Sequence, residues 1–205
     1  MTSAASGPTD RELRLIGPVA GKRVLDLGCS TGSAAINFAK QGAVVIAVDG
    51  SRAKLEIARA RADAEETKVE FREGDLADLA FLRADSVDVV FSGGAIGEVE
   101  DLARVFRQVQ RVLRPHAAFV FSCDHPFALG VGPDGVVRHS YFDPGPVTVD
   151  RDGGQVQLFT RSISEIFTEL GRAGFRVDTI VEPRPARYDE KIPSAIIWRA
   201  RKEGT

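Results

Sequence analysis

The feature that most constrains this chain is a glycine turn between an apolar run and a helical pattern. The run Val24-Leu-Asp-Leu27 leads into Gly28-Cys-Ser-Thr-Gly32, and a helix is expected to open directly after it. Glycine removes the side chain where a ligand must approach the backbone, and a helix N-terminus offers free amide groups and the positive end of its dipole. The segment predicts a strand-turn-helix unit that holds a nucleotide-like ligand.

Short runs rich in β-branched residues alternate with helical patterns along the chain. This alternation is typical of a parallel sheet that is covered by helices on both faces. A helix is also expected at Asp10–Ile16, ahead of the first strand. The expected strands are 23–27, 44–48, 68–72, 87–91, 118–122, 176–181 and 195–199.

Two later helices can be placed by their residue patterns. Residues 102–113 carry a single apolar stripe, the spacing of a helix packed on a sheet. Ser162 and Glu165 have the spacing of a capping box, and Gly174 suits the end of the helix that follows. We expect this last helix to direct three apolar side chains inward, namely Ile166, Phe167 and Leu170.

Residues 126–160 form an irregular segment between the fifth strand and the last helix, and long insertions of this kind are usually functional. Val147–Val149 and Gln155–Phe159 alternate in polarity around Asp152-Gly-Gly154, which predicts a small hairpin. We interpret the segment as a flap over the edge of the sheet. The rest of residues 1–205 is expected to form one domain.

Composition excludes several classes of protein. With 205 residues, 43% hydrophobic and 27% charged, the chain matches one soluble domain with a full core. Its net charge of -2 gives no positive field for nucleic acid, and no apolar run approaches the ~20 residues of a membrane span. We therefore expect a cytoplasmic protein without nucleic-acid or membrane partners. Cys29 and Cys123 are expected to be small buried residues, and no metal site is expected.

The acidic residues after the strands indicate which ligand the turn binds. The dinucleotide pattern Gly-x-Gly-x-x-Gly fails because Ser30 and Ser33 stand at two of its glycine positions, and no phosphate-loop lysine follows. A buried carboxylate at Asp26 needs hydrogen bonds or a cation. Asp49 lies where an acid accepts ribose hydroxyls, and Asp75 follows the third strand.

Seven motifs follow one another along the chain, at 24–32, 48–51, 73–76, 87–92, 99–101, 111–115 and 173–175. Together they resemble the class I S-adenosylmethionine-dependent methyltransferases that act on small molecules. The resemblance implies an α/β, Rossmann-like, seven-stranded sheet in the order 3-2-1-4-5-7-6 with one antiparallel strand and helices on both faces. One departure is Pro115-His-Ala117, which stands where the family has a Pro-Gly-Gly turn.

The same resemblance assigns the cofactor site, with S-adenosyl-L-methionine as the cofactor. The glycine turn and Asp26 would face its methionine part, Asp49 its ribose, and Asp75 with Leu76 its adenine. The expected cofactor-binding residues are Asp26, Gly28, Cys29, Ser30, Gly32, Asp49, Gly50, Ser51, Asp75, Leu76, Ser92, Gly93 and Ile96.

Fewer residues point to catalysis. His125 follows the fifth strand in a His-Pro pair that similar enzymes often carry, and we interpret it as a general base. The alternative is a histidine that only hydrogen-bonds the flap. Glu98, Asp124 and Tyr141 are expected substrate contacts, whereas a solvated loop is favoured for His139.

The leading hypothesis is transfer of a methyl group to an oxygen or nitrogen of a small metabolite beneath the flap. The motifs of enzymes that methylate base amines, of RNA cytosine-C5 enzymes and of metal-dependent catechol enzymes are absent. The alternatives are a nicotinamide-dependent oxidoreductase and a non-catalytic S-adenosylmethionine-binding regulatory protein. The protein is expected to be a monomer or a homodimer.

Overall fold

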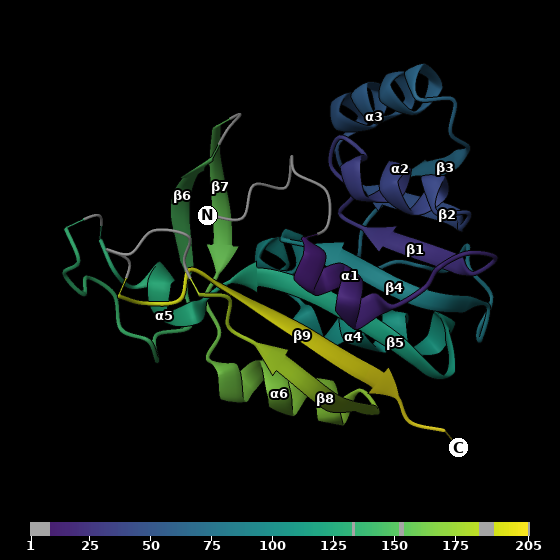
Figure 1. Cartoon of the computed structure of the whole chain (residues 1–205). Coiled ribbons are helices and arrows are strands. Elements are labelled where there is room, and N and C mark those ends of the chain that lie inside the picture. Colours follow the sequence, from purple (N-terminus) through teal and green to yellow (C-terminus); the bar gives the residue numbers. More distant parts are fainter. Residues whose placement is uncertain (1–8, 133, 152–153, 185–190, 205) are drawn as a thin grey trace.

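A seven-stranded sheet in the order β3-β2-β1-β4-β5-β9-β8 is the framework of the molecule (Figure 1). The computed structural model describes residues 9–132, 134–151, 154–184 and 191–204. The strands of this sheet are β1 (Arg23–Leu27), β2 (Val44–Asp49), β3 (Val69–Glu73), β4 (Val87–Gly93), β5 (Leu113–Asp124), β8 (Phe175–Val181) and β9 (Ala195–Lys202). Only β9 runs antiparallel to its neighbours, so the expected order and the single antiparallel strand are confirmed.

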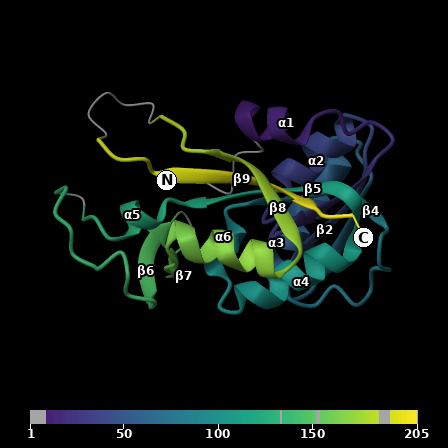
Figure 2. The same cartoon turned by 90° about the horizontal axis from the view of Figure 1, so that it is seen from below.

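Helices cover both faces of the sheet. Figure 2 shows α1 and α2 on one face and α4 and α6 on the other. The two apolar clusters of the core follow this division, because the first contains the buried faces of α4 and α6 and the second contains those of α1 and α2. The helices are α1 (Asp10–Ile16), α2 (Ser33–Lys40), α3 (Arg52–Ala64), the 3-10 helix η1 (Ala95–Glu98), α4 (Leu102–Val112), α5 (Pro126–Leu129) and α6 (Ile163–Arg172).

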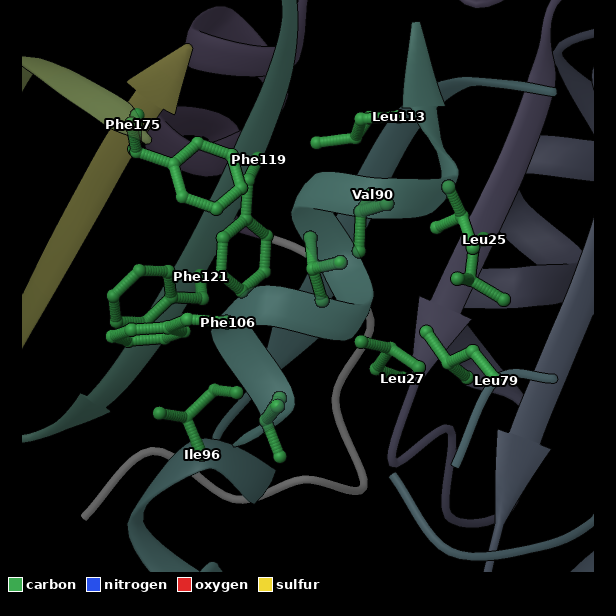
Figure 3. Packing of buried hydrophobic residues seen from close by; sticks show 14 of the residues in the cluster. Leu25, Leu27, Leu79, Val90, Ile96, Phe106, Leu113, Phe119, Phe121 and Phe175 are labelled. Atoms are coloured by element: carbon green, nitrogen blue, oxygen red, sulfur yellow. The ribbon is translucent and has the colours of Figure 1, made fainter. Parts of the chain in front are cut away.

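Aromatic side chains fill the larger cluster under α4. Phe106 of this helix packs on Phe119 and Phe121 of β5, with ring centroids 5.9 and 5.7 Å apart (Figure 3). Phe175 of β8 closes the cluster against Phe119 at 5.9 Å. Aromatic groups of this size bury more apolar area than aliphatic ones, so the cluster anchors β5, the strand that leads to the flap.

The expected hairpin is present as β6 (Pro146–Arg151) and β7 (Gly154–Phe159), which pair antiparallel. It stands beside the end of the sheet, next to α5 (Figure 1). Leu158 of β7 is buried where the strand packs on η1. Asp152 and Gly153 of the expected turn lie outside the described residues.

Local patterns placed most elements correctly, with two corrections. The capping box of Ser162 and Glu165 is present at the start of α6, but Phe167 is 53% exposed and does not face inward. Ile166 and Leu170 stand four residues apart and therefore face the sheet together. Phe167 is the next position along the helix after Ile166, so its side chain points in another direction, toward solvent. β5 begins at Leu113, earlier than expected. The segment 115–117 continues the strand, although His116 within it has a φ of +65°.

Candidate cofactor and acceptor site

The glycine turn brings β1 close to η1. Gly28 has a φ of +70°, and the amides of Gly28 and Cys29 both donate to the Val48 carbonyl, at 2.8 and 3.0 Å. A Cβ on Gly28 would lie 2.0 Å from the Cβ of Ala95. The absence of a side chain at position 28 therefore lets the first residue of η1 pack directly on the turn.

Asp49, at the end of β2, holds the turn through its side chain. One carboxylate oxygen accepts the Ser30 amide and the other accepts the Ser51 amide, both at 2.8 Å. A carboxylate offers about four acceptor positions, so each oxygen keeps one for another donor. The residue is buried yet lines the cleft described below, which suits it to accept hydroxyl groups.

Asp26 lies inside β1 with an unsatisfied oxygen. The residue is 1% exposed, and its Oδ2 has no hydrogen-bond partner among the described residues. Burial raises the pKa of Asp26 to about 7; the Ala35 amide acts in the opposite direction and Asp49 adds to the rise. An orphaned buried carboxylate oxygen fits a donor supplied by a ligand, such as an ammonium group.

A cleft of about 550 Å³ runs along the rim formed by the carboxyl ends of the strands. Asp75 uses its Oδ1 to accept the Ala77 amide at 2.8 Å and still faces the cleft. The expected cofactor residues that line the cleft are Gly28, Asp49, Gly50, Ser51, Asp75 and Leu76. Ala95 lines it as well, within the segment 92–96 that was expected on the other side of the cofactor. The cleft is also lined by residues not expected at the cofactor, including Lys54, Val99 and Arg104, and by Glu98, which was expected at the substrate.

The remaining expected cofactor residues are not among those that line the cleft. Ser92 is buried and donates to the Leu27 carbonyl at 2.8 Å, while Gly93 packs on the Phe91 ring. Ile96 belongs to the core beneath η1. Ser30 contributes its amide to Asp49, and Gly32 packs on Ala58 and Phe71. Direct contact with the cofactor stays a prediction for these residues, which are Asp26, Cys29, Ser30, Gly32, Ser92, Gly93 and Ile96.

Both cysteines are buried free thiols, as expected. Burial raises the pKa of Cys123 to about 12, and it raises the pKa of Cys29 as well. Because the thiolate is the reactive form, this raised pKa disfavours both thiols as nucleophiles.

His125 is buried and uses both ring nitrogens. Its Nδ1 accepts the Phe127 amide at 3.2 Å and so caps α5, while Nε2 lies 2.9 Å from an oxygen of Glu182. The accepting Nδ1 leaves the proton of a neutral ring on Nε2, which donates to Glu182. This arrangement agrees with the structural alternative for His125, and its role as a base stays a prediction.

The flap contacts the rim through Arg151. This guanidinium binds the carboxylate of Asp124 at the end of β5 and lies 3.3 Å from that of Glu98 at the end of η1. Asp124 and Arg151 also line a second cavity, of about 520 Å³, with His139 in its wall. Tyr141 lies elsewhere, because its hydroxyl accepts the Ile163 amide at the start of α6.

The described part of the chain shows neither a metal-binding cluster nor a membrane-spanning helix. Within those residues, no cluster of three or more His, Cys, Asp or Glu side chains is arranged to hold a metal ion. None of the helices found there is long and apolar enough to cross a membrane.

Comparison with known proteins places this site in a family. A methyltransferase-domain family model matches residues 24–116. The crystal structure of an S-adenosylmethionine-dependent methyltransferase from Mesorhizobium loti superposes with a TM-score of 0.78 at 27% identity, over 93% of this chain and 95% of that one. Residues 24–116 thus carry a methyltransferase domain, and nearly the whole chain is similar to an S-adenosylmethionine-dependent methyltransferase of known structure.

Two curated methyltransferases match part of the chain. A ubiquinone biosynthesis O-methyltransferase of Hahella chejuensis is 36% identical over 102 residues, which is 50% of this chain and 43% of that protein. A demethylmenaquinone methyltransferase of Clavibacter sepedonicus is 35% identical over 128 residues, or 62% and 49% of the two chains. The chain thus spans less than half the length of these two relatives.

The position of His125 in this methyltransferase leads to a first prediction. His125→Ala removes the cap of α5 and the contact with Glu182, so we expect the free energy of unfolding to fall by about 1–3 kcal/mol. We expect the affinity for S-adenosylhomocysteine to stay within about two-fold, because His125 does not line the cofactor cleft. Urea denaturation and calorimetric titration measure the two quantities. A large loss of affinity without a loss of stability would contradict the structural role.

Proposed function

We propose that this methyltransferase transfers a methyl group from S-adenosylmethionine to an oxygen or nitrogen atom of a small metabolite held beneath the flap. The observation that carries the proposal is the rim cleft, where the Asp49 and Asp75 carboxylates keep free acceptor positions, together with the orphaned oxygen of buried Asp26 just before the glycine turn. The names of the curated relatives point to small acceptors, since one acts in ubiquinone biosynthesis and one on demethylmenaquinone.

Different residues of the chain would hold different parts of the cofactor. Asp49 would accept the ribose hydroxyls, and Asp75 with Leu76 would hold the adenine. Asp26 would stabilise the positive amino group near the glycine turn. When bound, the cofactor supplies a methyl group on a positively charged sulfur.

The second cavity is the proposed acceptor site. It lies against β6 of the hairpin and adjoins the cofactor cleft at the ion cluster of Glu98, Arg151 and Asp124. Its walls combine apolar side chains such as Leu129 and Val149 with polar ones, the mixture typical of small-molecule pockets. Covering by the hairpin would exclude water and fix the acceptor in line with the methyl group.

The first test is cofactor binding by isothermal titration calorimetry. Wild-type protein should bind S-adenosylhomocysteine with one site per chain, whereas Asp49→Ala should lose about 100-fold or more in affinity, because two charge-assisted hydrogen bonds and the anchored turn are lost together. Asp63→Ala, on the exposed face of α3, is the matched control and should bind as the wild type does.

Titration with reduced nicotinamide cofactor distinguishes the alternative enzyme class. No heat of binding is expected from that cofactor. Saturable binding of it, with none of S-adenosylhomocysteine, would overturn the proposed function.

A further inference from the structure

Glu98 is the one carboxylate among the described residues that both lines the cofactor cleft and contacts the flap. Its Oε1 lies 3.3 Å from Nη1 of Arg151, a residue in the wall of the acceptor cavity. Its Oε2 accepts no hydrogen bond from the described residues, and 39% of the side chain remains exposed. The carboxylate therefore stands at the junction of the two cavities with one oxygen open to a donor.

Packing fixes the helix that carries this carboxylate. Ala95 at the start of η1 lies against Gly28, and Ile96 is 2% exposed in the core. Beyond the end of η1, Arg161 donates to the carbonyls of Val99 and Glu100. A side chain on so short and firmly held an element keeps its position relative to the glycine turn, as a catalytic group requires.

The other side chains expected at catalysis or at the substrate are committed to partners. Both ring nitrogens of His125 are in hydrogen bonds, and the Tyr141 hydroxyl accepts from the start of α6. Asp124 is 12% exposed and is directed at Arg151. Of the residues expected at catalysis or substrate binding, Glu98 alone faces the cofactor cleft.

Charges from four elements surround Glu98. Lys54 of α3 and Arg151 of β6 lower its pKa, while Asp49 of β2 and Asp124 of β5 raise it. Partial burial has the largest effect, and the pKa of Glu98 lies above its usual range. A carboxylate shifted in this direction is a better proton acceptor near neutral pH than an ordinary glutamate.

We propose that Glu98 accepts the proton that the acceptor loses during methyl transfer. The inference rests on the proposed function. The acceptor's oxygen or nitrogen forms a bond to the methyl carbon, the carbon–sulfur bond breaks with its electron pair left on sulfur, and the acceptor's proton moves to a Glu98 carboxylate oxygen. Glu98 then returns the proton to solvent through its exposed edge.

This role requires Glu98 to lie near the cofactor sulfur. A base stands about 3 Å from the proton-bearing atom, and that atom stands about 3–3.5 Å from the methyl carbon, so the carboxylate lies within roughly 8 Å of the sulfur. S-Adenosylmethionine carries a positive charge on that sulfur and S-adenosylhomocysteine does not. Glu98 should therefore favour the first ligand over the second, and this preference can be measured without knowing the acceptor.

The experiment compares the affinities of the two ligands by calorimetry at pH 8. Glu98→Gln keeps the shape of the side chain and removes its charge. We expect the ratio of S-adenosylmethionine affinity to S-adenosylhomocysteine affinity to fall by about 2- to 30-fold, the range that Coulomb's law gives at roughly 8 Å between water and a protein surface. Glu98→Asp keeps the charge and should retain most of the wild-type ratio.

Glu100→Gln is the matched control, because Glu100 also lines the cleft but makes no side-chain contact with Arg151. It should leave the ratio unchanged. An unchanged ratio in Glu98→Gln, or an equal fall in Glu98→Asp or Glu100→Gln, would overturn the assignment. Absence of binding of both ligands to the wild type would instead overturn the proposed function. Circular dichroism confirms that each variant is folded. If Glu98→Gln is not, Glu98→Ala removes the same charge and is compared in its place.

Discussion

Gly28→Ala should lower the free energy of unfolding by about 2–5 kcal/mol relative to the wild type and should bind S-adenosylmethionine far more weakly. Two penalties combine at this position. An alanine at φ +70° costs about 1–2 kcal/mol, and its Cβ would lie 2.0 Å from that of Ala95, an overlap of the kind that costs a further 1–3 kcal/mol. Relief of the overlap moves η1 away from the turn, and with it Glu98 and the wall of the cleft.

Two control variants separate these penalties. Gly21, in the turn that the Lys22 amide closes on the Val19 carbonyl, has nearly the same φ, +74°, and a methyl group added there would meet nothing within 4 Å. Gly21→Ala should therefore show the backbone penalty alone. Ala95→Gly in the Gly28→Ala background should restore the part that is due to overlap. Urea denaturation gives the free energies and calorimetry the affinities. Equal losses in Gly28→Ala and Gly21→Ala would contradict the contact between the turn and η1.

Features encoded by neighbouring residues were predictable from the sequence. The glycine turn, the capping box of Ser162 and Glu165, and the strands β1, β2 and β4 depend on residue spacing within a few positions. Their order in the sheet came from a family resemblance carried by several motifs at once. The acids that end the strands were also identified, because parallel strands bring their carboxyl ends to one edge of the sheet.

Features that depend on long-range contacts were not predictable. Arg151 forms ion pairs with Glu98 and Asp124, which lie 53 and 27 positions away in the sequence. No local pattern of residues predicts such a pairing. The buried role of Ser92 depends on the carbonyl it faces in β1, which only the register of β1 and β4 determines. His116 adopts φ +65° at a place where the family pattern has glycine, so the fold imposes there a conformation that the residue type disfavours.

The buried carboxylate of Asp26 makes stability and cofactor binding respond in opposite directions to one substitution. Its pKa is about 7 in the folded protein, against about 3.9 for an ordinary aspartate. As the pH rises above 4, the unfolded chain loses this proton while the folded protein keeps it, so Asp26 reduces stability progressively from pH 4 to pH 7. Above pH 7 both states are ionised and the loss is constant.

Asp26→Asn removes this titration. The difference in free energy of unfolding between the variant and the wild type should therefore shift by about 3–4 kcal/mol in favour of the variant from pH 4 to pH 8. Its affinity for S-adenosylmethionine should fall by about ten-fold or more, because a neutral amide no longer attracts the cofactor's amino group. Urea denaturation at the two pH values and calorimetry at pH 8 measure both effects.

Parallel stability curves for the two proteins would show that Asp26 is ionised in the folded state throughout. A variant that gained stability and still bound the cofactor at full strength would show that the orphaned oxygen serves no ligand. The expected combination, greater stability with weaker binding, is what a carboxylate kept for its ligand at the expense of the fold should give.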